Sequence, residues 1–123
     1  MKNRIYPREK YLSKIRPFYD SDIVKVITGI RRCGKSSILK SIINELANRN
    51  LSDRIIYLPL DKRGYKNINT PEQLENKIEE CIKDSGMYYL IIDEVQNVYG
   101  FEKIILQYEE EGYSIFLTGS NSY

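Results

Sequence analysis

The residues most able to do chemistry form one short string that fits the phosphate-binding loop pattern G-x-x-x-x-G-K-[ST]. The string is Gly29, Ile30, Arg31, Arg32, Cys33, Gly34, Lys35 and Ser36. Glycines in such a loop let successive backbone N–H groups turn toward a polyphosphate, and the helix that follows adds the partial positive charge of its N-terminus. We therefore expect Lys35 to contact the β- and γ-phosphates of a nucleotide and Ser36 to ligate magnesium.

The segments on either side of the string support this interpretation. Residues 23–27 are a β-branched run typical of a buried strand, and residues 36–50 repeat apolar side chains at helical spacing. Strand, glycine loop and helix thus follow in the order that phosphate binding requires; an ordinary glycine turn before a helix is the alternative. The expected nucleotide-binding residues are Gly29, Arg31, Arg32, Cys33, Gly34, Lys35, Ser36 and Ser37.

A second candidate group is the pair of acids that ends the apolar run 88–94. Adjacent carboxylates repel each other and need a counter-charge, which a magnesium ion supplies. We expect Asp93 to hold Mg²⁺ through its water shell, and Glu94 to orient or deprotonate the water that attacks the γ-phosphate. The plainer alternative is a strand that ends in solvated acids at a turn.

Length and composition indicate a single domain over residues 1–123, with 41% hydrophobic and 29% charged residues. The sequence has no membrane-length apolar run and no signal-peptide pattern, so we expect a cytoplasmic protein without a membrane partner. Cys33 and Cys81 lack metal or redox spacing and are expected to be reduced thiols. Because the chain has no histidine, glutamate remains the candidate general base.

The overall net charge of +2 hides a basic N-terminal arm over residues 1–16, which carries six lysines and arginines against one glutamate. Two interpretations stay open: a solvated helix face, or a contact with nucleic acid. No pattern of stacking aromatic residues accompanies the charge, so the sequence does not favour nucleic acid as a partner.

The remaining segments alternate between strands and helices. Helices are expected from Pro7 to Pro17, from Thr70 to Gly86 and from Phe101 to Gly112, and strands at residues 54–60 and 113–118, with a loop at 61–69. Thr70 to Gln73 form a capping box, and Pro59 favours an edge position for its strand. This alternation predicts an α/β fold with a parallel sheet and helices on both faces.

Taken together, the motifs resemble those of the bacterial and archaeal AAA-family ATPases, more narrowly those with an ATPase domain followed by a C-terminal domain of unknown function. The stretches that carry the resemblance are residues 8–12, 26–36, 92–98 and 117–122. The resemblance implies binding of ATP or ADP with Mg²⁺, ATP hydrolysis, and a polar sensor of the γ-phosphate on the last strand. Asn121 matches the sensor best, and Ser120 is the alternative.

The resemblance also implies a P-loop NTPase three-layer αβα sandwich with strand order 5-1-4-3-2, counted along the chain. Because the sequence ends at Tyr123, we expect an N-terminal fragment, truncated after the sensor strand, without strand 5, the helical lid, a clear arginine finger or the C-terminal domain. Strand 23–28 would then lie at an edge, blunted only by Lys25. We expect it to form a homo-oligomer or to be covered by the N-terminal segment.

Three other functions remain as alternatives. Asp93 to Gln96 resemble the DExQ box of superfamily-1 helicases, although the Gly-Asp-x-x-Gln motif of those motors is missing from the next strand. A nucleotide-gated interaction module with vestigial hydrolysis is the second alternative. A phosphotransferase acting on a small acceptor is the third, and the sequence offers no acceptor pocket for it.

Overall fold

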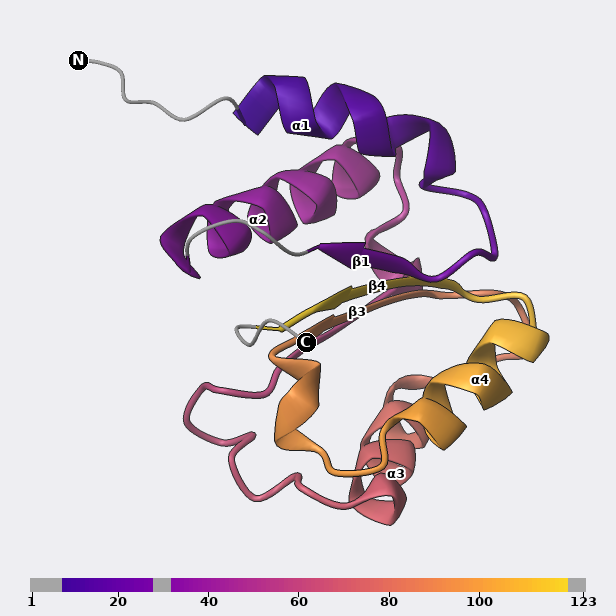
Figure 1. Cartoon of the computed structure of the whole chain (residues 1–123). Helices are drawn as coiled ribbons and strands as arrows, with labels where there is room; N and C mark the ends of the chain where they lie inside the picture. The colour runs from indigo at the N-terminus through magenta and orange to yellow at the C-terminus, as the bar shows by residue number, and fades with distance from the viewer. Residues whose placement is uncertain (1–7, 28–31, 120–123) are drawn as a thin grey trace.

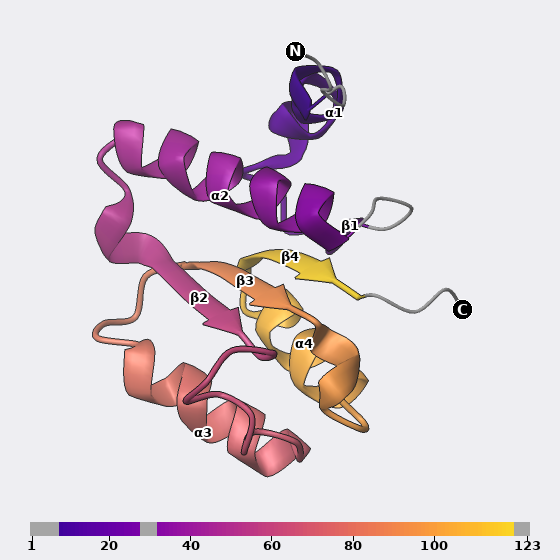
Figure 2. The ribbon, with the colours of Figure 1, turned by 90° about the vertical axis from the view of Figure 1, so that its left-hand side faces the viewer.

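The chain folds into three layers, which Figures 1 and 2 show from two sides. The computed structural model describes residues 8–27 and 32–119. Two helices cover one face of a central sheet and two cover the other, as expected for an αβα sandwich. The first pair is α1 (Arg8–Ile15) and α2 (Arg32–Asn48), and the second is α3 (Pro71–Cys81) and α4 (Glu102–Glu110).

Within the described residues the sheet has four strands, all parallel. They are β1 (Lys25–Ile27), β2 (Ile55–Pro59), β3 (Tyr89–Asp93) and β4 (Ser114–Thr118). Their order is β1-β4-β3-β2, which confirms the expected fold class and the edge positions of β1 and β2. Parallel strands end at the same edge, so the carboxyl ends of β1, β4 and β3 lie side by side.

Apolar side chains fill both faces of the sheet. Strands β3 and β4 are buried along their whole length, as is usual for parallel strands covered on both sides. Leu90 and Ile92 of β3 pack toward α3 and α4, while Ile91 packs with the buried face of α2. None of the described helices has both the length and the apolar composition needed to cross a bilayer.

Helix α2 begins at Arg32, four residues before the expected start at residue 36. Within its first turn Lys35 is buried against Glu94, a tertiary contact that local sequence patterns do not reveal. The other end comes two residues early because Asn50 takes a left-handed conformation (φ 64°). The N–H of Leu51 donates to the carbonyl of Leu46 at 3.1 Å, and this bond closes the helix end.

Helix α3 starts where the sequence predicts but ends earlier. The hydroxyl of Thr70 accepts a bond from the N–H of Gln73, and the Gln73 side chain accepts one from the N–H of Thr70. The helix ends at Cys81 instead of continuing toward Gly86.

A side chain a few residues further along the chain accounts for that early end. The Tyr88 hydroxyl accepts bonds from the N–H groups of Lys83 and Asp84, at 2.8 and 3.2 Å. These N–H groups therefore bond to a side chain from the start of the next strand instead of to helix carbonyls.

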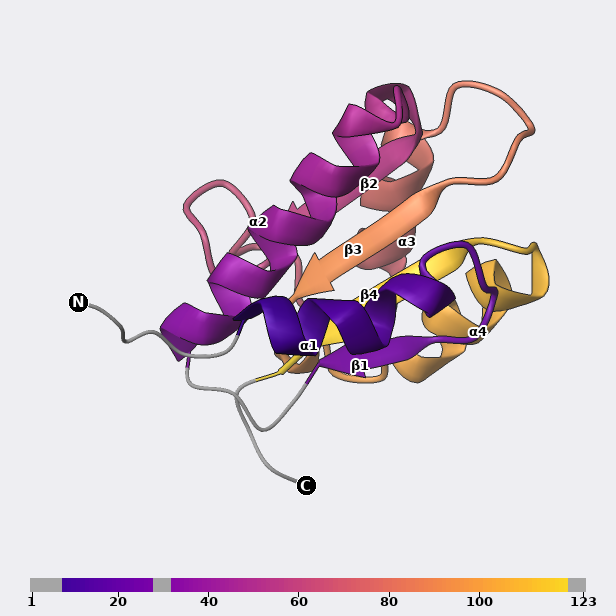
Figure 3. The same cartoon turned by 90° about the horizontal axis from the view of Figure 1, so that it is seen from above.

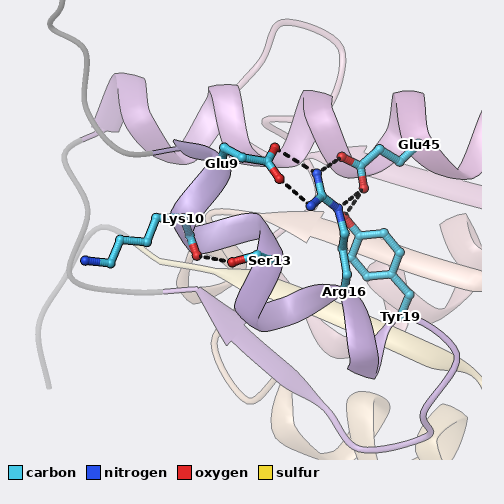
Figure 4. A network of polar contacts seen from close by, with 6 residues as sticks. All are labelled: Glu9, Lys10, Ser13, Arg16, Tyr19 and Glu45. Carbon is cyan, nitrogen blue, oxygen red and sulfur yellow. Dashed lines mark hydrogen bonds and ion pairs between the residues drawn. The ribbon is translucent and has the colours of Figure 1, made fainter.

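Short 3-10 turns join several elements: η1 (Arg16–Phe18), η2 (Ser52–Arg54) and η3 (Val95–Asn97). At the first of them, Arg16 ties α1 to α2 (Figure 4). Its guanidinium donates to Glu9 and to Glu45, at 2.9 Å and 2.7 Å for Nη2, and the Tyr19 hydroxyl also donates to Glu45. The bonds from Arg16 lower the pKa of the Glu45 carboxyl. One basic residue of the N-terminal arm is thus already paired with two carboxylates.

The edge strand β1 differs from expectation in which side chain it exposes. Lys25 was expected to blunt the edge, but it is only 7% exposed, whereas Val26 is 58% exposed. Alternate residues of a strand face opposite sides, and Lys25 faces the side where α1 lies over β1 (Figure 3). The ammonium donates to the carbonyl of Ser21 at 2.7 Å and to the Ser114 hydroxyl at 2.8 Å, above the Phe116 ring.

Burial lowers the pKa of Lys25 to about 8. Between this value and the usual pKa of lysine, the unfolded chain binds more protons than the folded chain, so Lys25 makes stability rise with pH in that window. We expect the unfolding free energy of wild type minus that of Lys25→Met to increase by about 1–3 kcal/mol from pH 7 to pH 10. Urea unfolding at the two pH values measures it. Lys103→Met, at an exposed position of α4, is the control, and parallel pH profiles of wild type and Lys25→Met would contradict the prediction.

Candidate functional site

The predicted chemical groups gather in a pocket at the carboxyl edge of the sheet. The pocket has a volume of about 370 Å³ and is lined by Ser36, Ser37, Lys40, Asp61, Lys62, Asp93 and Glu94. Three elements build it: the first turns of α2, the end of β3, and the loop that follows β2. Ser36 of the first sequence motif and the acids at 93–94 therefore meet in space, as phosphate chemistry would require.

A buried carboxylate of the pocket, Glu94, pairs with the buried ammonium of Lys35. The Lys35 ammonium lies 3.1 Å from Glu94 Oε2, and the two side chains are only 3% and 6% exposed. The other carboxylate oxygen, Glu94 Oε1, accepts a bond of 2.8 Å from the Gln96 side-chain amide. In this state the expected phosphate-binding cation and the expected general base neutralise each other.

Glu94 lies just beyond β3 in an unusual backbone conformation. Its φ and ψ angles of 58° and 50° are left-handed, a region that side chains other than glycine disfavour by about 1–2 kcal/mol. Such strain persists only where surrounding contacts impose it, and it is common at functional sites. The sequence predicted the residue type here but not this turn of the chain.

Asp93 is the last residue of β3 and is buried. Burial raises the pKa of its carboxyl, and the charge of Asp61 acts in the same direction. The hydroxyl of Thr118 donates to Asp93 Oδ1, and the ammonium of Lys35 lies nearby; both lower the pKa.

A magnesium ion would be held at this site by few protein groups. Among the described residues no three acidic, histidine or cysteine side chains gather to hold a metal directly. Of the hydroxyls and carboxylates that line the pocket, Ser36 and Asp93 are the two that the sequence predicts as metal-holding groups. Mg²⁺ keeps several waters and binds through one or two protein groups plus substrate phosphates, so these two residues suit it.

Several expected residues cannot be placed. Gly29 and Arg31 lie outside the described residues, as do both sensor candidates, Ser120 and Asn121. Arg32 and Cys33 open helix α2, but their side chains are not described. Of the expected nucleotide-binding residues, Lys35, Ser36 and Ser37 are those whose side chains the structure brings to the site, and Gly34 contributes backbone in the same turn.

The structure adds residues that the sequence analysis missed, Lys40, Asp61, Lys62 and Thr118, and it gives Gln96, noted there only in the DExQ-like stretch, a role beside Glu94. Three of them carried a usable signal. Asp61 and Thr118 come at the carboxyl ends of parallel strands, where ligands bind in open α/β sheets, and Lys40 lies one helical turn after Ser36. Gln96 becomes visible only because η3 folds it back toward Glu94.

Comparison with known proteins agrees with this geometry. The sequence profile of the AAA domain family matches residues 21–123. The chain belongs to this family. Membership indicates an ATPase-like phosphate-loop domain, and the four-stranded parallel sheet with helices on both faces is consistent with the fold of such AAA domains.

Two relatives of this AAA domain are described only as uncharacterized proteins. One, from Haemophilus influenzae, is 33% identical over 125 residues, which cover 99% of this chain and 31% of the relative. The other, from Methanocaldococcus jannaschii, is 32% identical over 99 residues, which cover 80% of this chain and 21% of the relative. The chain thus spans less than a third of the length of either relative. No solved structure matches it.

The buried Lys35–Glu94 pair leads to a prediction about stability. Removing one partner leaves the other charge buried without compensation, so Lys35→Met and Glu94→Gln should each destabilise the fold by about 3 kcal/mol. The double variant should lose less than the two single losses together, with a coupling energy of about 1–3 kcal/mol.

Urea unfolding of the four proteins measures this coupling. The pair Lys77 and Glu80 is the matched control: its ammonium and carboxylate are 3.5 Å apart, and its side chains are 35% and 68% exposed. Its coupling should stay below about 0.5 kcal/mol. Equal coupling in both pairs would show that burial does not strengthen the Lys35–Glu94 interaction.

Proposed function

We propose that this AAA domain binds ATP with Mg²⁺ and hydrolyses it. The observation that carries the proposal is that Asp93 and Glu94 line one pocket beside the first turns of α2 and that Glu94 pairs with Lys35 of the first turn. A helix N-terminus and a lysine attract phosphate, and a pair of acids at the end of a neighbouring strand serves the metal and the attacking water.

Each residue has a separate task in this proposal. Lys35 leaves its pair with Glu94 and binds phosphate oxygens through its ammonium group. Ser36 and Asp93 hold the magnesium ion, directly and through water. When bound, the ion supplies positive charge that neutralises the phosphate oxygens. Glu94 then accepts a proton from the water that attacks the γ-phosphate, and the backbone N–H groups of residues 31–36 surround the phosphates.

The Lys35–Glu94 pair implies that the two groups are active only when nucleotide separates them. A phosphate offers Lys35 an anion with more charge than one carboxylate, so exchange of partners is favourable. The bond of Glu94 to Gln96 and its left-handed backbone do not involve Lys35, so this exchange does not require either to change. The base therefore becomes free of the ammonium only when substrate is present.

Partners beyond the nucleotide are also part of the proposal. We infer that the work driven by hydrolysis depends on a further, C-terminal domain of the kind that the family resemblance implies, and on association of several copies. The exposed Val26 on edge strand β1 is compatible with such an association. Nucleic acid remains an alternative partner for the basic arm.

Nucleotide binding can be tested with Lys35→Ala. Loss of the ammonium should weaken the binding of ADP and of a non-hydrolysable ATP analogue by at least about 10-fold, because a charge-assisted bond to phosphate is lost. Isothermal titration calorimetry measures the affinities. Lys103→Ala, which removes an exposed lysine on α4, is the control and should bind like wild type. Equal affinities of Lys35→Ala and wild type would refute the binding site.

The base assignment can be tested separately with Glu94→Gln. This change should reduce single-turnover phosphate release by about 10²–10⁴-fold, the usual contribution of a general base. ADP affinity should stay the same or rise, since Lys35 no longer has a carboxylate partner to leave. Glu80→Gln on α3 is the control. A Glu94→Gln protein that hydrolyses ATP at the wild-type rate would show that another group acts as the base.

A further inference from the structure

Thr118 occupies a central place among the elements that build the site. It is the last residue of β4, the strand that lies between β1 and β3. Thr118 lies opposite Ile27 of β1, and the residue before it, Leu117, lies opposite Ile92 of β3. Thr118 therefore lies between the end of the strand that leads into the phosphate loop and the end of the strand that carries the two acids, and it is fully buried.

One hydroxyl group of Thr118 bonds to both acidic residues. Oγ1 accepts a bond of 3.0 Å from the backbone N–H of Glu94 and donates its hydrogen to Oδ1 of Asp93. A hydroxyl has a single hydrogen, so donation to Asp93 fixes its orientation and turns a lone pair toward Glu94. All three residues are buried, which removes competition from water.

These two bonds hold the left-handed backbone of Glu94 and the buried carboxylate of Asp93 in place. Glu94 holds a left-handed backbone conformation, and its N–H is anchored by Thr118 at that turn. The turn places the Glu94 carboxylate against Lys35 and Gln96. Asp93 meanwhile has one carboxylate oxygen fixed, which limits rotation of the group.

We propose that Thr118 is a positioning residue, whose hydroxyl orients the metal-binding carboxylate of Asp93 and the backbone that carries Glu94. This proposal rests on the proposed nucleotide function of the same site. Thr118 acts through its neighbours and need not touch nucleotide. Groups that orient metal ligands in this way commonly change metal affinity or activity by 10–100-fold when they are removed.

The test compares Thr118→Val, which keeps the shape but removes the hydroxyl, with Thr118→Ser, which keeps the hydroxyl. Calorimetry measures ADP affinity with Mg²⁺ and with EDTA in each protein. In Thr118→Val the gain in affinity on adding Mg²⁺ should shrink by about 10-fold, while the affinity in EDTA stays within about 3-fold of wild type. Thr118→Ser should restore the magnesium response. In turnover, Thr118→Val should lower kcat more than it raises KM.

Ser114→Ala is the matched control, because Ser114 is a fully buried hydroxyl on the same strand. It bonds to Lys25 and to the carbonyl of Tyr19 at the opposite end of β4, so its loss should affect stability without changing the magnesium response. Thr118→Ala provides a second deletion of the hydroxyl should Thr118→Val fail to fold.

The outcomes separate this proposal from the proposed function. If wild type binds ADP and Thr118→Val or Thr118→Ala keeps the full magnesium response, the role of Thr118 is refuted and nucleotide binding stands. A response that weakens equally in Ser114→Ala would refute it too, because the effect would then be structural. If wild type binds no ADP in either condition, both proposals are overturned.

Discussion

Burial of charge at one edge of the sheet is the constraint on which the rest of this structure depends. Lys35, Asp93 and Glu94 are nearly inaccessible to water, and isolated charges in such surroundings are strongly unfavourable. Each is therefore held by a specific partner: Lys35 by Glu94, Glu94 also by Gln96, and Asp93 by Thr118. The charged groups of the candidate site are thus engaged with one another or with neighbouring polar side chains, and in the proposed function a ligand would exchange these partners.

The parallel sheet makes this concentration of charge possible. Strands β1, β4 and β3 all end at the same edge, and α2 begins there, so residues more than fifty positions apart in sequence meet without long side chains. The core on both faces fixes the strands, since β3 and β4 are buried along their length. Rigid strand ends suit a site in which a carboxylate and an ammonium are placed 3.1 Å apart.

The opposite end of the sheet is held by a different kind of contact. Arg16 and Tyr19 converge on Glu45, which docks α1 on α2, and Lys25 reaches Ser114 beneath α1. These polar contacts accompany the apolar packing of Leu12 and Ile15. They cover one face of β1 but leave Val26 exposed on the other. The N-terminal helix thus completes one layer of the domain, and the outer edge of the sheet remains open among the described residues.

The sequence alone determined the α/β class through its alternation of strands and helices, and the candidate residue types of the site through the spacing of the loop 29–36 and the acids 93–94. The strand order was predicted from the family resemblance that these motifs carry, and the structure confirms it for the four described strands. It also predicted the start of α3 from its capping box and the edge position of β2 from Pro59. Tertiary structure decided the rest. The early end of α3 goes with bonds from Lys83 and Asp84 to the nearby Tyr88 hydroxyl, which no capping pattern predicts. The burial of Lys25 depends on Ser114, which is distant in sequence. The Lys35–Glu94 pair and the bonds of Thr118 to Asp93 and Glu94 also join residues that are distant in sequence. Such buried groups pair because their strands are neighbours in the sheet, and no short stretch of sequence encodes that neighbourhood.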